Sequence, residues 1–486
     1  MTVFHSDSSR RTFLKLGACA FLSTGLKGQR ILGANNRLRL GILGCGIRGN
    51  ELLKYFAKLS DVEIVAISDP DTAQMDAMVA RFNKNGNSDN IPEVDRIQDY
   101  RKLYERPDID AVAIASPNYW HALQAVQALQ SGKHVYLEKP VSFTPWESLQ
   151  LEIAERKYGK ILAAGYQNRS STGPLAGIAY LQEGNLGKVR KLRSLCYRNR
   201  DSIGKLDQPL ELPETIDYDL WLGPAQEHTL MRPRLHYDWH WDFHTGNGDI
   251  GNQGVHEIDL VCWLLGDPEL PTRIQTFGNR FAWDDAGNTP NMITSWFQMG
   301  GADVILETND LKLSPTRNAS PNRMGTRVGI IAECEKGYLK GGRFGMVALE
   351  SDGETIIKKF PGDGGETHQR NFVDAVKAAD PSLLRSRVQT ASTSASLAHF
   401  SNISHRLGEL ASSAALAEKL SSNDDLSEIL ADQQKQLSDW GISEPRYLVG
   451  KTLQIDPALH ALKGRWADDS LTGPNYRKGF ELESQS

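Results

Sequence analysis

Two segments of the chain carry side chains that could move a proton on a substrate. In the first, Lys139 follows Glu138 after a short apolar run, and Pro140 prevents a helix and stiffens the turn. A lysine held there can hydrogen-bond a substrate hydroxyl and favour its oxygen as a proton leaves. The alternative is a lysine paired with Glu138 or with a surface acid. The spacing alone leaves both interpretations open.

The second segment, residues 246–259, combines an amide with an imidazole. If its helix begins near Asn252, then Asn252 and His256 lie one turn apart on the same face. His256 has the intrinsic pKa range of a general base near neutral pH. Taken by itself, such a histidine is more often a hydrogen-bonded core residue. Its catalytic role is therefore a hypothesis that depends on its surroundings.

A glycine-rich turn indicates the cofactor that would lie beside these side chains. Residues 44–49 have G-x-G-x-x-G spacing, after the apolar run 38–43 and before a helix-like run. The glycines permit a tight turn and a close approach to a pyrophosphate, which the N-terminus of the next helix stabilises. Asp69 follows about 25 residues later, where an acid can bond the adenosine ribose of NAD, although it could also cap a helix. The predicted cofactor is NAD, with NADP possible.

An aromatic segment, residues 236–244, alternates rings with polar tips. Aromatic faces beside hydrogen-bonding groups are typical of carbohydrate pockets, which makes Trp239, His240 and Trp241 candidate substrate residues. A core strand with an aromatic face is the plainer alternative. Three histidines at intervals of four could also bind a metal, but no cysteine or second-shell pattern supports them, so we predict no metal site.

Composition and charge exclude several classes of protein. The 486 residues carry a net charge of −5, which gives no reason to expect nucleic acid or an anionic membrane as a partner. Five dispersed cysteines form neither a C-x-x-C pair nor a metal spacing. No apolar run reaches the roughly 20 residues that span a bilayer. Residues 9–15, SRRTFLK, and the apolar stretch after them match a twin-arginine signal, which predicts export to the periplasm.

The order of the segments predicts an α/β fold in two domains. Residues 35–168 alternate strand-like and helix-like runs, which predicts a parallel Rossmann sheet covered on both faces. Residues 169–410 predict a second α/β domain on a mostly antiparallel sheet, between a signal segment (1–34) and a polar C-terminal extension (411–486). Ligands of parallel sheets lie beyond the carboxyl ends of the strands. The turns expected to line one crevice are those at Gly44, Asp69, Ser116, Glu138 and Gly165.

Taken together, four segments resemble the Gfo/Idh/MocA oxidoreductase family, and the chain most resembles its exported, glucose–fructose oxidoreductase-like branch. They read GILGCGIRG at 41–49, ASPNYWH at 115–121, GKHVYLEKP at 132–140 and GNQGVHEID at 251–259. Their order and spacing match the family from about residue 37 to 410. The E-K-P element after the G-K-H-V strand is far more specific than the glycine turn alone.

The resemblance implies a Rossmann domain, an open second sheet often used to form homo-oligomers, a catalytic Lys139 and proton transfer at His256. The family typically has an acid four residues before that histidine, where this chain has Asn252. An amide can orient a hydroxyl but cannot take a proton, so Asn252 is expected to orient the substrate, and His256, with or without Lys139, is expected to be the base, unless an earlier helix start lets Asp249 compensate. The expected cofactor-binding residues are Gly44, Gly46, Ile47, Arg48, Gly49, Asp69, Ser116, Asn118, His121, Glu138, Lys139 and Gln167. The expected substrate residues are Trp239, His240, Trp241 and Asp259.

These observations lead to one main hypothesis and two alternatives. The main hypothesis is an NAD(P)-dependent oxidoreductase that acts on a sugar, polyol or sugar derivative. Because free NAD(H) is available in the cytoplasm, an exported enzyme should hold its cofactor tightly and regenerate it within its own site. The first alternative is redox-neutral, NAD-dependent glycoside cleavage or epimerisation. The second is a non-catalytic sugar-binding protein, to which the substitution at Asn252 gives some weight.

Overall fold

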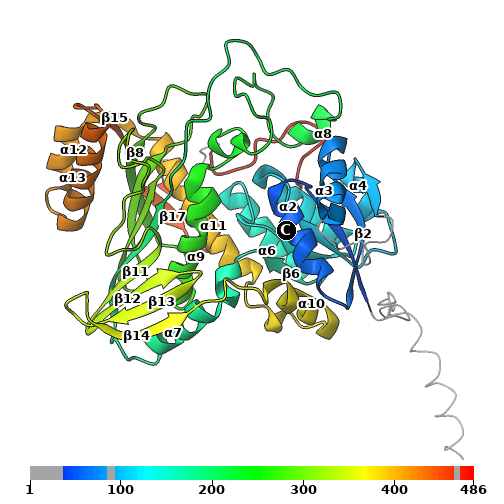
Figure 1. The fold of residues 1–486 in the computed structure, drawn as a ribbon, viewed down its shortest axis with the longest axis horizontal. Coiled ribbons are helices and arrows are strands. Elements are labelled where there is room, and N and C mark those ends of the chain that lie inside the picture. Colours follow the sequence, from blue (N-terminus) through cyan, green and yellow to red (C-terminus); the bar gives the residue numbers. More distant parts are fainter. Residues whose placement is uncertain (1–36, 85–93, 465–470, 486) are drawn as a thin grey trace, which may run out of the picture.

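Two sheets, one parallel and one mixed, organise the chain (Figure 1). The structure is a computed structural model that describes residues 37–84, 94–464 and 471–485. The predicted signal segment, residues 1–34, lies outside the described residues. Among those described, every helix is too short or too polar to span a bilayer.

The N-terminal sheet has six strands in the order β3-β2-β1-β4-β5-β6, and all pairs are parallel, which confirms the predicted parallel sheet; the edge strand β3 was not predicted. Except for the edge strand β3, its strands are mostly apolar and buried, because helices cover both faces. The strands are β1 (Leu38–Leu43), β2 (Val62–Ser68), β3 (Asp95–Ile97), β4 (Ala111–Ile114), β5 (His134–Leu137) and β6 (Leu162–Ala164). The helices are α2 (Ile47–Ala57), α3 (Thr72–Lys84), α4 (Tyr100–Tyr104), α5 (His121–Gln130) and α6 (Pro145–Tyr158).

The second sheet has twelve strands, and every pairing except the parallel β7–β10 pair is antiparallel, which confirms the predicted mostly antiparallel sheet. Its main path runs β14-β13-β12-β11-β7-β10-β9-β8-β16-β15. The strands are β7 (Val189–Tyr197), β8 (Arg273–Asn279), β9 (Met292–Met299), β10 (Ala302–Asn309), β11 (Val328–Cys334), β12 (Gly337–Gly342), β13 (Gly345–Leu349), β14 (Ile356–Pro361), β15 (Glu409–Ser412), β16 (Arg446–Val449), β17 (Leu453–Asp456) and β18 (Ala461–Leu462).

Helices between the two sheets join the domains. Helices α7 (Thr172–Gln182), α9 (Val255–Leu264) and α11 (Val388–Arg406) pack on the inner face of the second sheet, and α9 and α11 lie on the side of the Rossmann domain (Figure 1). Helix α10 (His368–Ala378) instead packs on α2 through Phe372 and Phe56. The polar side chains of α9 are therefore carried directly to the carboxyl ends of the Rossmann strands.

The sequence predicts a polar surface extension from residue 411, but the structure makes most of this segment part of the second domain. Strands β15 and β16 extend the large sheet, while α12 (Ser413–Leu420) and α13 (Asp424–Asp439) cover its outer face. The few apolar residues of the two helices are spaced to meet the sheet. Those that pack together here are Leu416, Leu420, Leu426, Ile429, Leu430 and Leu437 with Phe277, Met292, Ile305 and Tyr447.

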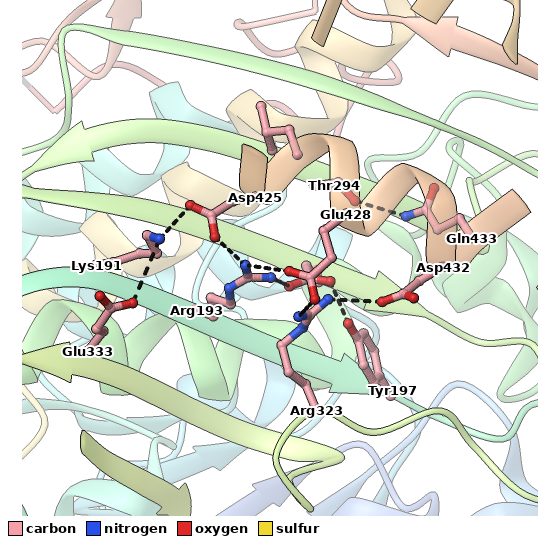
Figure 2. Close-up of polar contacts among 12 residues, drawn as sticks. Lys191, Arg193, Tyr197, Thr294, Arg323, Glu333, Asp425, Glu428, Asp432 and Gln433 are labelled. Carbon is pink, nitrogen blue, oxygen red and sulfur yellow. Dashed lines mark hydrogen bonds and ion pairs between the residues drawn. The ribbon is translucent and has the colours of Figure 1, made fainter. Parts of the chain in front are cut away.

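Charged side chains complete the attachment of α13 (Figure 2). Arg193 on β7 is nearly buried and contacts Asp425 at 2.6 Å and Glu428 at 3.6 Å on the helix, with Glu307 at 3.3 Å on β10. Arg323 pairs with the same Glu428 and with Asp432 of α13. Because a buried arginine needs partners for its charge, this network requires α13 to stay on the sheet.

Candidate active site

The carboxyl ends of β1, β2, β4 and β5 converge on one cavity of about 340 Å³. It receives four of the five turns that the sequence places in one crevice, namely those at Gly44, Asp69, Ser116 and Glu138. The predicted site residues that line it are Gly44, Gly46, Ile47, Arg48, Asp69, Ser116, Asn118, His121, Glu138, Lys139, Trp239, His240 and Asn252. Among the described residues, the predicted ones outside this lining are Gly49, Gln167, Trp241, His256 and Asp259.

Each glycine of the turn meets a different steric requirement. Gly44 has a φ of +85°, and a Cβ there would lie 2.6 Å from the backbone of Ala115. A Cβ on Gly49 would lie 1.8 Å from the carbonyl oxygen of Gly44, because helix and strand approach closely. Gly46, the N-cap residue of α2, faces open space within the cavity lining. The free N-terminus of α2 and the open position at Gly46 fit a pyrophosphate.

Asp69 is fixed beside this turn by two backbone donors. Its Oδ2 accepts a hydrogen bond from Cys45 N at 2.7 Å, and its Oδ1 accepts one from Asp71 N at 2.9 Å. Burial raises the pKa of the Asp69 carboxyl. Asp71 bonds the first turn of α3 through Ala73 N at 3.0 Å. Asp69 lines the cavity, so the ribose-binding role stays a prediction that its position favours.

Ser116, Asn118 and His121 form the wall after β4. The His121 ring lies between two carbonyl oxygens, at 2.8 Å from Ser116 and 2.6 Å from Pro140, and burial lowers its pKa. Asn118 donates to Asn247 Oδ1 at 2.5 Å, across to the second domain. Its own Oδ1 is buried without a partner among the described residues. Asn118 therefore offers an acceptor at the wall of the cavity.

Glu138 follows β5 and lines the next side of the cavity. It accepts hydrogen bonds from Arg48 Nε at 2.7 Å and from Gln167 Nε2 at 3.2 Å, so Gln167 lies behind it rather than in the cavity lining. Burial opposes ionisation of Glu138, but the charges of Arg48 and Lys139 outweigh it and hold its pKa below the ordinary value. Arg48 keeps a buried NH2 group without a partner among the described residues. That guanidinium nitrogen is available to a ligand.

Lys139 and Asn252 meet across the domain boundary. Lys139 Nζ donates to the carbonyl oxygen of Asn252 at 2.8 Å and to its Oδ1 at 3.3 Å. Burial lowers the pKa of Lys139, against the opposing charge of Glu138. An ammonium group has three donors, and these two contacts leave one for a substrate oxygen.

The helix behind Asn252 begins earlier than the sequence predicts. A π-helical turn, Ile250–Gly254, precedes α9, and Asp249 is its N-cap residue. Asn252 Nδ2 donates to Asp249 Oδ1 at 2.9 Å, while Arg200 holds the same carboxylate through two bonds of 2.9 Å. Asp249 is fully buried, so it reaches the site only through Asn252. The amide is thereby turned with its oxygen toward Lys139.

His256 lies near Lys139 but not in the cavity lining. Its ring meets Tyr166 edge-on at a centroid distance of 5.8 Å. Its Nδ1 is buried without a hydrogen-bond partner among the described residues. Burial, and then the charge of Lys139, lowers the pKa of His256 well below its ordinary value. The imidazole is therefore uncharged at neutral pH and keeps one nitrogen free to accept a proton.

The neighbouring Glu257 gives a stability prediction. Among the described residues, the side chain that donates to Glu257 is Gln253, through Nε2 at 3.2 Å, and burial raises the pKa of Glu257 from 4.5 to about 8. The folded protein then binds a proton between these pH values that the unfolded chain releases. Stability should fall as pH rises through this window, by up to about 1.4 kcal/mol per pH unit. In denaturant unfolding at pH 5 and pH 8, Glu257→Gln should flatten this fall; parallel curves would contradict the assignment.

The aromatic segment divides between cavity and core. Trp239 and His240 stack at a centroid distance of 3.6 Å and line the cavity. His240 Nδ1 donates to the carbonyl oxygen of Tyr237 at 2.5 Å, which leaves Nε2 as an acceptor. The structure places the other two predicted substrate residues elsewhere: Trp241 is buried against Arg200, and Asp259 forms a buried ion pair with Arg169 at 2.8 Å.

The three evenly spaced histidines of this segment diverge because a short 3-10 turn interrupts it. His236 contacts Asp71 at 2.9 Å, His240 contacts the Tyr237 carbonyl, and His244 contacts Asp242 at 2.9 Å. The three rings therefore contact three separate groups in different places. The interval of four therefore does not bring these three rings together.

Sequence reasoning did not predict that the long loop after β7 crosses the cavity. We call residues 198–249, between β7 and the π-helical turn, the covering loop; it includes α8 (Tyr218–Leu222). Its Leu220, Trp221, Tyr237 and Trp239 line the cavity. Next to Asp69, Thr72 N donates to Thr215 O at 3.0 Å and Asp217 N donates to Pro70 O at 2.9 Å. These bonds attach the loop to the turn after β2. No local sequence pattern predicts this pairing.

A C-terminal tail, residues 471–485, fixes the covering loop from outside. Arg477 Nε donates to Gly223 O at 2.8 Å, its NH2 donates to Asp219 O at 2.6 Å, and its backbone N donates to Pro224 O at 3.1 Å. Phe480 packs edge-on against Trp120 of the Rossmann domain at 5.5 Å. The tail therefore connects the loop to the domain whose crevice it covers.

Comparisons with known proteins agree with this arrangement. A model described as an oxidoreductase family with an NAD-binding Rossmann fold matches residues 38–166, and a model of that family's C-terminal alpha/beta domain matches residues 201–319. The NADH- and UDP-GlcNAcA-bound structure of the WlbA dehydrogenase from Bordetella pertussis has a TM-score of 0.55 at 16% identity, over 74% of this chain and 94% of that one. This likeness shows a shared fold.

Two curated relatives match shorter parts. A glycosyl hydrolase family 109 protein of Shewanella pealeana is 37% identical over 120 residues, which are 24% of this chain and 26% of that protein. A 1-carboxy-3-chloro-3,4-dihydroxycyclo hexa-1,5-diene dehydrogenase of Comamonas testosteroni is 25% identical over 300 residues, 59% of this chain and 66% of that protein. The chain thus spans about a quarter of the length of the first curated relatives it matches.

Proposed function

Because the chain belongs to the Gfo/Idh/MocA oxidoreductase family, we propose that it is an NAD(P)-dependent oxidoreductase acting on a sugar, polyol or sugar derivative. The observation that carries the proposal is the contact of Lys139 with Asn252 at the cavity. It joins a fixed ammonium group to the crevice that fits a dinucleotide. The family's NAD-binding Rossmann model covers the same crevice.

We assign the chemistry to three side chains. Lys139 donates its third N–H to the reacting hydroxyl and stabilises negative charge on that oxygen. Asn252, oriented by Asp249, holds the ammonium group in place. His256 accepts the hydroxyl proton, because it lies near Lys139 and its buried Nδ1 has no hydrogen-bond partner among the described residues. When bound in the crevice, the nicotinamide supplies the hydride acceptor and donor.

The wall formed by Trp239 and His240 favours a polyhydroxylated substrate. The stacked rings offer a flat apolar surface to one face of a sugar. His240 Nε2, which keeps its lone pair, accepts a hydrogen bond from a neighbouring hydroxyl. We leave Trp241 and Asp259 out of this substrate site, because both are buried in other contacts.

We also propose that the cofactor stays bound and is recycled within the site. The twin-arginine pattern at residues 9–15 favours export to the periplasm, where free NAD(H) is not the working currency. The covering loop supports this proposal, because it is bonded to the Rossmann domain at Thr215 and Asp217 and lines the cavity at Trp221. Oxidation of one substrate would then be followed by reduction of a second.

The purified protein is therefore expected to retain about one nicotinamide nucleotide per chain after extensive dialysis. Nucleotide would be released by denaturation and quantified by chromatography. A panel of sugars and polyols added to the untreated protein should change nicotinamide fluorescence for the substrate class. Recovery of nucleotide-free protein that turns over only with added NAD would contradict bound, recycled cofactor, while leaving the oxidoreductase proposal intact.

The match to the glycosyl hydrolase family 109 protein favours a second candidate, redox-neutral glycoside cleavage or epimerisation. In that reaction one substrate is oxidised and later reduced again, so no reduced cofactor accumulates. The same panel should include aryl glycosides, with product analysis by mass spectrometry and NMR. Cleavage or epimerisation without net change in bound NADH selects this candidate, whereas ketone accumulation selects the net oxidoreductase.

We further propose a homo-oligomer that uses the outer face of β13 and β14. Opposite the face that packs on α7, Tyr338 of β12 is packed with Met324 on Ile331, whereas β13 and β14 present Val347 and Ile357, and Ile357 is 38% exposed. Light scattering should give a mass above 53.9 kDa for the wild-type chain, and Ile357→Glu should lower it by placing a charge at the interface. A monomeric wild-type protein would contradict this proposal.

A further inference from the structure

The covering loop carries a second cluster of chemically active side chains, His228, Asp242 and His244. His228 Nε2 lies 2.6 Å from Asp242 Oδ2, and His244 Nδ1 lies 2.9 Å from Asp242 Oδ1. The two rings are stacked with centroids 4.1 Å apart, and the three candidate ligand atoms lie within 4.8 Å of one another. We propose that this cluster binds a zinc ion, with two imidazole nitrogens and one carboxylate as ligands.

The donor set suits zinc. Zinc sites with three protein ligands commonly combine histidine nitrogen and carboxylate oxygen at about 2.0–2.2 Å, with water in the fourth position. Tetrahedral ligands at that distance stand about 3.3 Å apart, so the present 2.6 Å and 2.9 Å contacts must open by only about half an ångström. The side chain of His244 is 46% exposed, which gives it room to adjust and gives the ion a path from solvent.

The surroundings orient the ligands in the way that a metal site needs. His228 Nδ1 faces the carbonyl oxygen of Gln226 at 3.3 Å, and a carbonyl can only accept. The Nδ1 nitrogen therefore carries a proton, and Nε2 can bind the ion once zinc takes the place of the proton that Nε2 shares with Asp242 Oδ2. Asp242 is itself held by Asn288 Nδ2 at 3.1 Å. Backbone carbonyls and hydrogen-bonded carboxylates are the usual outer partners of metal-binding histidines.

One neighbour opposes the ion. Arg232 NH1 lies 3.3 Å from Asp242 Oδ2. Both residues are buried, so water screens the repulsion between the arginine and a divalent cation only weakly. Arg232 should therefore weaken zinc affinity without removing any ligand. Two kinds of variant should therefore change zinc affinity in opposite directions: Arg232→Gln should tighten zinc binding, whereas loss of a ligand should weaken it.

The position of the cluster indicates what the ion would do. His228 lies on one limb of the covering loop, and Asp242 and His244 lie on the other. Between them are Tyr237, Trp239 and His240, which line the cavity. An ion that joins the two limbs would fix this wall without touching the substrate. The proposal is independent of the redox reaction, because it depends only on the loop.

The test is calorimetric titration of ZnCl2 into tag-free full-length protein, after treatment with EDTA and dialysis. We expect one site per chain and a rise in melting temperature. His244→Gln and Asp242→Asn should each weaken binding by about tenfold or more, and Arg232→Gln should strengthen it several-fold. Glu227→Gln is the matched control, because Glu227 is an exposed acid beside His228 that is not a ligand.

Zinc-edge X-ray absorption of the loaded protein gives an independent readout. It should show two nitrogen ligands and at least one oxygen ligand at about 2.0–2.2 Å. The half-exposed His244 makes its glutamine variant the one expected to fold normally, which circular dichroism without metal would check. Absence of saturable zinc binding, or equal binding by wild type and His244→Gln, would overturn the proposal.

Discussion

Replacing Lys139 by alanine is expected to lower kcat by about 10²–10⁴-fold while nucleotide and sugar still bind. Lys139 is the only described ammonium group in the cavity lining, and no other donor of that charge stands beside Asn252. Its loss removes the group that stabilises negative charge on the reacting oxygen. The covering loop and the glycine turn are untouched, so binding should remain. Turnover, nucleotide content and sugar binding would be measured on the same preparation.

Lys54→Ala is a suitable control, since Lys54 is an exposed lysine on α2. Its turnover should equal that of the wild-type protein. If Lys139→Ala retained full turnover, the proposed catalytic assignment would be wrong. If neither the wild-type protein nor Lys139→Ala turned over any member of the panel, but both bound sugar, the non-catalytic sugar-binding alternative would be favoured.

The features that the sequence predicted are those set by local patterns. Apolar runs and turn residues sufficed for the central strands of the parallel sheet, because these strands are buried on both faces. The glycine spacing placed the turn at Gly44 and Gly46 correctly at the cavity, because the steric requirement is local. Lys139 follows the same rule, since the end of a parallel strand fixes its position in the crevice.

What the sequence could not predict depends on contacts between distant segments. The start of the helix near Asn252 shifted because a π-helical turn brings Asp249 to its amide, which Arg200 then supports from another part of the chain. Asp259 was predicted to be a substrate residue. Its partner Arg169 lies 90 residues away and takes it into the core.

The position of the segment after residue 411 also depends on contacts with distant residues. Its composition is polar, and the sequence predicted an extension on the surface. Its polar residues nevertheless meet charges on the sheet, as Asp425 does with Arg193, so polarity did not imply solvent exposure (Figure 2). The tail at 471–485 likewise acts through bonds to the covering loop that composition does not reveal.

Arg477→Ala is expected to speed release of bound nucleotide by about tenfold, and combining it with Phe480→Ala should have a larger effect. The Arg477 side chain donates to the carbonyl oxygens of Gly223 and Asp219 in the covering loop. Hydrogen bonds contribute about 0.5–1.5 kcal/mol each, and 1.4 kcal/mol is a factor of ten. Phe480 attaches the tail to Trp120, so its loss frees the same loop from the Rossmann domain.

The measurement is the rate at which the purified protein loses its nucleotide to an excess of a competing analogue, with the melting temperature recorded alongside. Lys478→Ala is the matched control, because Lys478 is an exposed cation between the two tested residues. It should release nucleotide at the wild-type rate. An unchanged rate in the double variant would mean that the covering loop holds the crevice closed without the tail, through its bonds at Thr215 and Asp217 alone.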